Sequence, residues 1–199
     1  MTRTPKLFIF DCGDVLFREN HVWNILFSAL GRPDIRNVRE LGENATRAVE
    51  GMLDDSIQEP EFWELVEKDF GKTIEWKGLL KKYYQSMIDG EVVAILERLK
   101  AKGFRVVAGT NVILPFYEIN QGKGYYTVFQ EVYASCFTKV SKPSPDFFLD
   151  IARKESVSPE DMFFTDDMPR NVRASLSLGI QTVRFQGAAR LVSCLEPLL

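Results

Sequence analysis

Apolar residues of the chain form short continuous runs that alternate with longer segments of helical spacing. Residues 7–10 form a short apolar run that follows Lys6 and ends at Asp11, which is typical of a strand buried on both faces of a parallel sheet. After Gly90 the pattern predicts strands over residues 104–109, 131–135, 162–165 and 180–185, and helices over residues 91–102, 144–155, 169–178 and 188–195. Alternating strands and helices predict an α/β fold with a parallel sheet and right-handed crossovers.

The segment from residue 18 to residue 89 has a different pattern. Its apolar residues recur at helical spacing and are interrupted at residues 31–33, 54–55 and 71–72. These breaks predict three or four helices and no strand. We therefore expect a helical insert over residues 18–89 and a discontinuous α/β core formed by residues 1–17 and 90–199.

Composition excludes several classes of protein. The chain has 199 residues, of which 45% are hydrophobic, and a chain of this size can bury a substantial core, which argues against intrinsic disorder. Its formal net charge is -3, and no run of Lys or Arg forms a basic stripe. Nucleic-acid binding is therefore not expected.

The cysteines and the single histidine limit which kinds of catalytic or metal site the chain can form. Cys12, Cys136 and Cys194 are scattered and form no C-x-x-C pair, so neither a disulfide framework nor a thiolate zinc site is predicted. No apolar run is long enough for a signal-peptide core or a membrane span. We expect a soluble cytoplasmic protein. Because His21 is the only histidine, carboxylates and lysine are the stronger candidates for catalysis.

The residues that directly follow the predicted strands lie at the edge where open parallel sheets bind ligands. They are Asp11, Cys12, Gly13 and Asp14 after the first strand, Thr110 and Asn111 after the second, Lys142 beyond the third, and Asp166 and Asp167 after the fourth. Carboxylates suit Mg²⁺, and Lys, Thr and Asn suit phosphoryl oxygens. A strand-end Asp can also attack phosphorus directly and form an aspartyl-phosphate.

Four segments carry a resemblance to the haloacid dehalogenase (HAD) superfamily of phosphohydrolases, and the resemblance covers nearly the whole chain. They are residues 10–16 (FDCGDVL), 106–111 (VVAGTN), 141–148 (SKPSPDFF) and 163–171 (FFTDDMPRN). The resemblance implies a Rossmann-like three-layer α/β/α core with a small all-helical cap over residues 18–89, closest to the branch that includes sugar-phosphate phosphatases. It also implies a Mg²⁺-dependent phosphatase acting on a small phosphorylated metabolite.

The resemblance also assigns roles to residues. Asp11 would be the nucleophile, assisted by Lys142 and Thr110. The implied phosphate-binding residues are Thr110, Asn111 and Lys142. The implied Mg²⁺ ligands are Asp11, the Gly13 carbonyl and Asp166, with Asp167 as a further ligand or as the partner of a ligand.

Position 13 departs from the family pattern. The family usually has a second Asp there, which protonates the leaving oxygen and then activates water, whereas this chain has Gly13. General acid–base catalysis contributes about 10² to 10⁴ in rate, so the alternative function is a slow or non-catalytic regulatory protein that binds phosphate and metal. Asp14 could substitute as the acid, although we expect its displaced side chain to point elsewhere.

Two other features have a simpler interpretation. Cys12 and Arg18 match the C-x5-R spacing of cysteine-dependent phosphatases, but residues 15–17 are apolar and should be buried, so we consider this match accidental. Five residues of the helical insert could contact substrate, although surface charge or core packing is the preferred interpretation for each: His21, Arg47, Trp23, Trp63 and Trp76.

Overall fold

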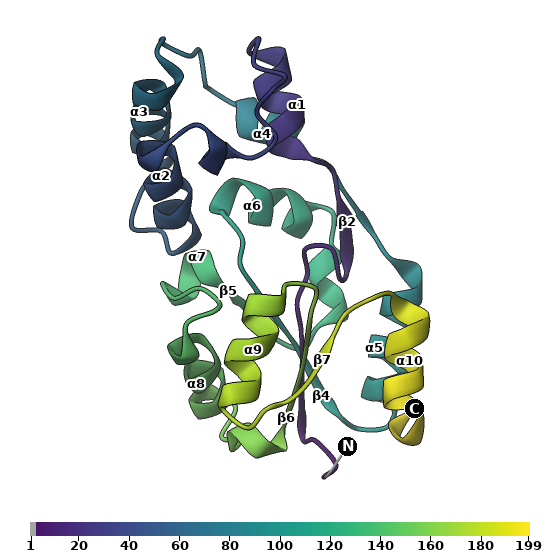
Figure 1. The fold of residues 1–199 in the computed structure, drawn as a ribbon. Coiled ribbons are helices and arrows are strands. Elements are labelled where there is room, and N and C mark those ends of the chain that lie inside the picture. The colour runs from purple at the N-terminus through teal and green to yellow at the C-terminus, as the bar shows by residue number, and fades with distance from the viewer. Residues whose placement is uncertain (1–2) are drawn as a thin grey trace.

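A five-stranded parallel sheet lies at the centre of the computed structural model, which describes residues 3–199 (Figure 1). The strands are β1 (Leu7–Phe10), β4 (Arg105–Thr110), β5 (Val132–Ala134), β6 (Met162–Asp166) and β7 (Gln181–Arg184). They lie in the order β5-β4-β1-β6-β7, and every neighbouring pair is parallel. All five strands expected from the sequence are therefore present.

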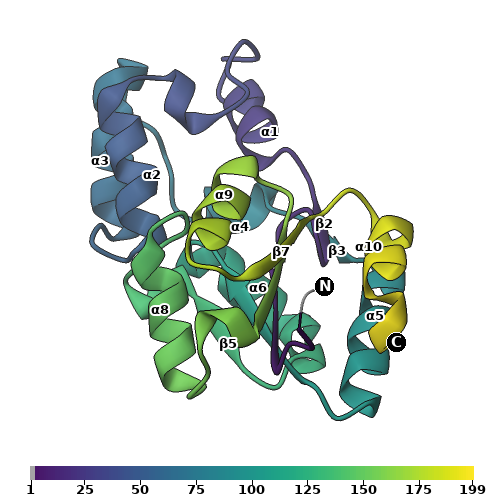
Figure 2. The ribbon, with the colours of Figure 1, turned by 60° about the horizontal axis from the view of Figure 1, so that its bottom comes forward.

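Helices cover both faces of this sheet (Figures 1 and 2). On one side are α5 (Gly90–Ala101) and α10 (Ala188–Leu195), and on the other are α8 (Pro145–Lys154) and α9 (Pro169–Ser177). Phe8 and Phe10 pack in the α5/α10 cluster, and Leu7 and Ile9 pack in the α8 cluster. Successive strand side chains point to opposite faces, so a strand covered on both sides is apolar throughout. The three-layer Rossmann-like core is confirmed.

Residues 18–89 contain the four helices α1 (Val22–Ala29), α2 (Glu43–Leu53), α3 (Glu59–Phe70) and α4 (Leu79–Tyr83). The expectation of no strand in this segment is wrong. The short strands β2 (Phe17–Glu19) and β3 (Ser86–Ile88) pair antiparallel where the chain leaves and re-enters the core. A three-residue strand has too few positions to show an alternating pattern, so only the pairing reveals it.

Several other short elements complete the described chain. Helices α6 (Leu114–Gly122) and α7 (Ser135–Thr138) were not expected from the sequence. The 3-10 helices are η1 (Val38–Glu40), η2 (Tyr125–Val128), η3 (Pro159–Asp161) and η4 (Glu196–Leu198). Among residues 3–199, no helix is both long and apolar enough to cross a membrane.

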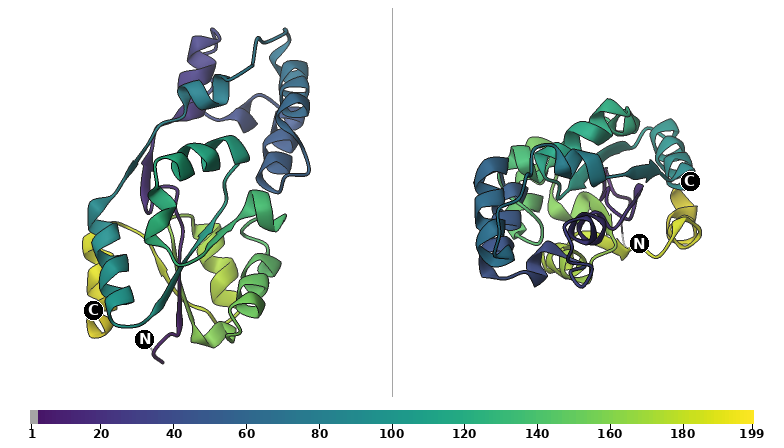
Figure 3. Two further views of the ribbon diagram at one scale, coloured as in Figure 1. Left: turned by 180° about the vertical axis from the view of Figure 1, so that it is seen from behind. Right: turned by 90° about the horizontal axis from the view of Figure 1, so that it is seen from above.

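The helices of residues 18–89 stand beyond the carboxyl ends of the strands and share an apolar cluster with α6 (Figure 3). Trp63 is fully buried, and Trp23 packs against Phe27, Phe62 and Phe116. Core packing is therefore confirmed for both tryptophans. The cluster extends to Phe116 of α6, so the helical segment is joined to the α/β core by apolar contact.

We expect Glu155→Gln to lower the free energy of unfolding by about 1 kcal/mol at pH 7. Arg105 donates to both Glu155 oxygens, at 2.9 and 3.0 Å, and the Tyr133 hydroxyl donates at 2.7 Å. The Arg105 hydrogen bonds hold the pKa of Glu155 below its ordinary value. The stabilisation is therefore complete above the unfolded-state pKa and is lost as pH falls through the folded-state pKa. Urea unfolding at pH 7 and pH 3 measures this effect, and an equal difference at both pH values would contradict it.

Candidate active site

Four charged side chains meet at the carboxyl edge of the sheet. Asp11 follows β1, Asp166 is the last residue of β6 and Asp167 comes next, while Lys142 lies in the loop before α8. Because β1 lies beside β6 in the sheet, residues that are distant in the sequence become neighbours. The convergence expected from the strand order is therefore present in the structure.

Lys142 bridges two of these carboxylates. Its side chain is 0% exposed, and Nζ lies 2.8 Å from Asp11 Oδ1 and 2.6 Å from Asp166 Oδ2. Burial lowers the pKa of the Lys142 ammonium, but Asp11 and Asp166 together raise it above its ordinary value. Lys142 thus supplies a fixed positive charge between two acids.

Asp11 presents one free carboxylate oxygen. Oδ1 accepts hydrogen bonds from the Cys12 backbone N–H at 2.7 Å and from Lys142, whereas Oδ2 accepts none from residues 3–199. Burial raises the pKa of Asp11, the Lys142 charge lowers it and the Asp166 charge raises it, and together these effects bring the pKa to about 7. The contacts to Oδ1 fix the carboxyl group. Because Oδ2 accepts no hydrogen bond from the described residues, it is available to bind a cation or to attack a substrate.

Asp166 accepts more hydrogen bonds than Asp11. Its carboxylate is fully buried and accepts hydrogen bonds from the Met168 backbone N–H at 2.8 Å and from Asn171 Nδ2 at 3.0 Å to each oxygen. The sequence analysis did not single out Asn171, although it lies within the segment 163–171. Its position in the first turns of α9, directly after the acids, is the signal that could have identified it.

The three acids fit a hard divalent cation. One oxygen from each of Asp11, Asp166 and Asp167 can be chosen so that all three lie within 4.8 Å of one another. Asp167 is half-buried, and burial raises its pKa, with Asp166 and Asp14 adding to the effect. Lys142 offsets only part of this negative charge. An all-oxygen donor set of carboxylates matches the preference of Mg²⁺.

Thr110 and Asn111 lie at this edge but differ in their contacts. Asn111 Nδ2 donates to the Lys142 carbonyl oxygen at 2.7 Å, and Asn111 Oδ1 accepts from the Lys142 backbone N–H at 2.8 Å. Both polar atoms of the Asn111 side chain are therefore used to fix the Lys142 loop. Thr110 is buried beside the Cys12 thiol.

The loop after β1 favours carboxylate over thiol chemistry. Burial, followed by the Asp11 charge, raises the pKa of the Cys12 thiol well above its ordinary value, which suppresses the reactive thiolate. Val15, Leu16 and Phe17 are buried as expected. Asp14 is exposed, with φ of 53°.

Glu19 is an acidic residue that the sequence analysis missed. A Cβ atom added to Gly13 would lie 3.6 Å from Glu19 Oε1. Burial raises the pKa of Glu19 and the hydrogen bond with Tyr84 lowers it, and the net effect is a pKa of about 7. Glu19 lies on β2, a strand that the apolar pattern did not reveal. Only the pairing of β2 with β3 identifies its position.

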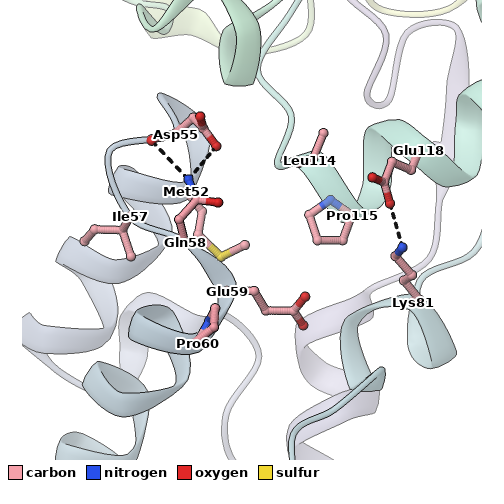
Figure 4. Close-up of a pocket in the computed structure, with 10 residues that line it drawn as sticks. All are labelled: Met52, Asp55, Ile57, Gln58, Glu59, Pro60, Lys81, Leu114, Pro115 and Glu118. Atoms are coloured by element: carbon pink, nitrogen blue, oxygen red, sulfur yellow. Dashed lines mark hydrogen bonds and ion pairs between the residues drawn. The ribbon is translucent and has the colours of Figure 1, made fainter.

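A separate pocket lies between the helical segment and α6 (Figure 4). Its walls include Gln58 and Glu59 on one side and Pro115 on the other, and the Lys81–Glu118 ion pair, 2.6 Å long, spans the two parts. Neither the acids of the strand ends nor Lys142 lines it. The pocket therefore belongs to the junction between the helical segment and the core.

Comparisons with known proteins agree with this geometry. A family model described as haloacid dehalogenase-like hydrolase matches residues 5–179. That range contains Asp11, Lys142, Asp166 and Asp167.

Two curated relatives match part of the chain. Flavin mononucleotide hydrolase 1 of Arabidopsis thaliana is 31% identical over 114 residues, which are 57% of this chain and 46% of that protein. Glyceraldehyde 3-phosphate phosphatase of Methanopyrus kandleri is 30% identical over 98 residues, which are 48% of this chain and 42% of that protein. The chain thus spans less than half the length of either relative.

Solved structures share the fold across nearly the whole chain. A HAD family enzyme of Bacteroides thetaiotaomicron has a TM-score of 0.80 and 19% identity, covering 97% of this chain and 99% of that one. A second structure of that enzyme, a complex with magnesium and inorganic phosphate, has a TM-score of 0.70 and 21% identity, covering 90% of this chain and 93% of that one.

Proposed function

The chain belongs to the haloacid dehalogenase-like hydrolases, and we propose that it is a Mg²⁺-dependent phosphatase that hydrolyses a small phosphomonoester, such as a sugar phosphate. The observation that carries this proposal is the buried Lys142 held between Asp11 and Asp166, which leaves Asp11 Oδ2 free. Two comparisons support this proposal. One of the relatives is a glyceraldehyde 3-phosphate phosphatase, and the structurally similar Bacteroides enzyme was solved with magnesium and phosphate.

In this mechanism Asp11 Oδ2 attacks the phosphorus atom and forms an aspartyl-phosphate, which water then hydrolyses. A carboxylate and a phosphate repel each other, and the buried ammonium of Lys142 offsets part of that repulsion. Asp11, Asp166 and the Gly13 carbonyl would hold Mg²⁺, with Asp167 as a ligand or supporting group. The bound Mg²⁺ would supply further positive charge next to the phosphoryl group that is transferred. Asn171 and Asn111 keep Asp166 and Lys142 in position.

Thr110 and the backbone around Asn111 would bind phosphoryl oxygens beside Lys142. The Asn111 side chain would act mainly by fixing the Lys142 loop, since its amide oxygen and an amide N–H are already hydrogen-bonded. We propose that residues 18–89 act as a cap that selects the substrate and excludes water during the reaction. All three cysteines are free, which suits a reducing compartment such as the cytoplasm.

A second candidate function is a regulatory protein that binds phosphate and metal but turns over very slowly. The observation that favours it is Gly13, which leaves no side chain at the position of the family's acid–base Asp. The two functions differ in turnover and not in ligand binding, so only a rate measurement separates them.

The test is phosphate release from a panel of phosphorylated sugars and other small phosphomonoesters. We expect Mg²⁺-dependent release from at least one of them, and loss of at least about 100-fold in rate when EDTA removes the metal, because the acids at positions 11, 166 and 167 then repel the phosphate. Excess Mg²⁺ should restore the rate. Release that is unaffected by EDTA contradicts the metal requirement, and phosphate binding without release favours the regulatory function.

A further inference from the structure

Cleavage of a phosphomonoester needs a proton donor for the oxygen that leaves. An alkoxide is a poor leaving group, and a positioned acid that protonates it contributes about 10² to 10⁴ in rate. The obvious groups of the site are already committed. Lys142 is held between two carboxylates, and both oxygens of Asp166 accept hydrogen bonds. Asp167 is assigned to the metal with Asp11 and Asp166, so the donor is sought among the other acids close to Asp11.

Glu19 has the right position for this donor. Its carboxyl group lies within 3.6 to 3.9 Å of the point where a side chain of residue 13 would begin, and residue 13 is two positions from Asp11. The Tyr84 hydroxyl donates to Glu19 Oε1 at 2.8 Å, whereas Oε2 accepts no hydrogen bond from residues 3–199. One oxygen is thus anchored, and the other is free to reach a substrate.

A connected set of hydrogen bonds holds Tyr84, the residue that donates to Glu19. Asn120 Nδ2 donates to the Tyr84 hydroxyl at 2.8 Å, and the Ser86 hydroxyl donates to Asn120 Oδ1. Lys123 Nζ donates to the Ser86 carbonyl oxygen at 2.8 Å and to its hydroxyl at 3.2 Å. Glu19 and Ser86 are also register partners in the β2–β3 pair. A connected polar network of this kind restricts side chains to one arrangement.

Aromatic packing holds the same residues in place. The Tyr84 ring stacks on Phe116 of α6, with ring centroids 4.0 Å apart and planes 7° from parallel. Asn120, which lies on the same helix, is 0% exposed. The Glu19 carboxyl group is therefore supported by β3 and α6 as well as by its own strand.

Asp14 is the competing acid, and its environment differs. Its side chain is exposed, its backbone has φ of 53°, and no side-chain hydrogen bond from residues 3–199 fixes its carboxylate. An acid that protonates a leaving oxygen must be held at a defined distance from it. The Tyr84 hydroxyl holds the Glu19 carboxyl group in place, whereas no such contact from residues 3–199 holds Asp14.

We propose that the Glu19 carboxyl group takes the place of the side chain absent at Gly13 and acts as the general acid and base of the reaction, with Tyr84 as its positioning residue. When Asp11 forms its bond to phosphorus, the ester P–O bond breaks and the leaving oxygen takes the Glu19 proton. The Glu19 carboxylate then takes a proton from water as the water oxygen bonds to phosphorus. The Asp11–phosphorus bond breaks, releasing phosphate and restoring both carboxyl groups. This inference rests on the proposed phosphatase function.

The test is Glu19→Gln measured on two substrates with different leaving groups. An alkyl phosphate needs the acid, and kcat/KM should fall about 100- to 1,000-fold. 4-Nitrophenyl phosphate has a good leaving group, so its kcat/KM should fall less than about 10-fold. Its steady-state kcat should fall more, because hydrolysis of the aspartyl-phosphate still needs the base. We therefore expect a burst of about one 4-nitrophenol per enzyme.

Matched variants separate this role from a structural one. Glu155→Gln changes another half-buried glutamate, which also accepts a hydrogen bond from a tyrosine hydroxyl but lies outside residues 18–89, and should leave the activity on both substrates unaffected. Tyr84→Phe should give a smaller loss with the same dependence on leaving group. Gly13→Asp added to Glu19→Gln should restore part of the alkyl phosphate activity, since a Cβ at position 13 makes ordinary contacts.

The outcomes are distinct. Equal losses on both substrates without a burst, or no loss on either, overturn the assignment of Glu19 while wild-type turnover leaves the phosphatase function standing. Absence of wild-type turnover on every substrate overturns the phosphatase function and this inference together. If Glu19→Gln does not fold, Tyr84→Phe decides: a loss confined to the alkyl phosphate supports the role, and an equal loss contradicts it.

Discussion

Asp11→Asn is expected to reduce phosphate release by at least about 1,000-fold with Mg²⁺ present, because the amide is a poor nucleophile and no other group can form the aspartyl-phosphate. The fold should be retained. Asn can still accept the Cys12 backbone hydrogen bond. The substitution removes only one of the two carboxylates that flank Lys142, so Lys142 keeps its ion pair with Asp166. Steady-state phosphate release and the midpoint of thermal unfolding, Tm, measure the two effects on the same sample.

Asp14→Asn is the matched control for this variant. Asp14 lies three residues from Asp11, but its side chain is exposed, so we expect activity within about twofold of wild type and an unchanged Tm. A strong loss in Asp14→Asn would identify Asp14 as the acid in place of Glu19. Substantial activity in Asp11→Asn would contradict the aspartyl-phosphate mechanism.

Lys142→Met is expected to have the second large effect, on stability as well as on activity. The fully buried ammonium lies 2.8 Å from Asp11 and 2.6 Å from Asp166. Its removal leaves two buried carboxylates uncompensated, and breaking such a buried pair costs about 3 to 5 kcal/mol. Phosphate release should fall at least about 100-fold, because the charge that offsets repulsion between Asp11 and phosphate is lost.

Urea unfolding with and without Mg²⁺ measures this prediction. Mg²⁺ should stabilise Lys142→Met more than wild type, because the cation then becomes the main positive charge near Asp11 and Asp166. Lys154→Met provides the control, since Lys154 pairs with Asp150 while 48% exposed, and such surface pairs contribute less than about 1 kcal/mol. A Lys142→Met protein as stable as wild type without Mg²⁺ would contradict the bridging role of Lys142.

Much of the α/β core could be predicted from the sequence because its signals are local. A strand covered on both faces is apolar at every position, so β1 and β6 are visible as short runs that end in an acid. Parallel strands place their carboxyl ends on one edge. That rule predicts from the sequence that Asp11, Asp166 and Lys142 lie at one site.

Other features of the site depend on contacts that no local pattern records. The pairing of β2 with β3 joins residues about seventy positions apart in the sequence, and this pairing places Glu19 opposite Ser86. Asn120 lies on α6, a helix absent from the sequence prediction, and its hydrogen bond completes the support of Tyr84. Asn111 was expected to bind phosphate, but the folded loop turns its amide toward the Lys142 backbone.

The sequence alone determined the α/β core, the helical segment and the acids and lysine that converge at the strand ends, because apolar periodicity and strand order are written in consecutive residues. Only the tertiary structure decided how those groups are oriented. It showed that Lys142 bridges two carboxylates and that the Glu19 carboxyl group lies beside the position where a side chain of residue 13 would begin. The physical reason is that hydrogen bonds between side chains require distances of about 3 Å, and such distances follow from long-range packing and not from spacing along the chain.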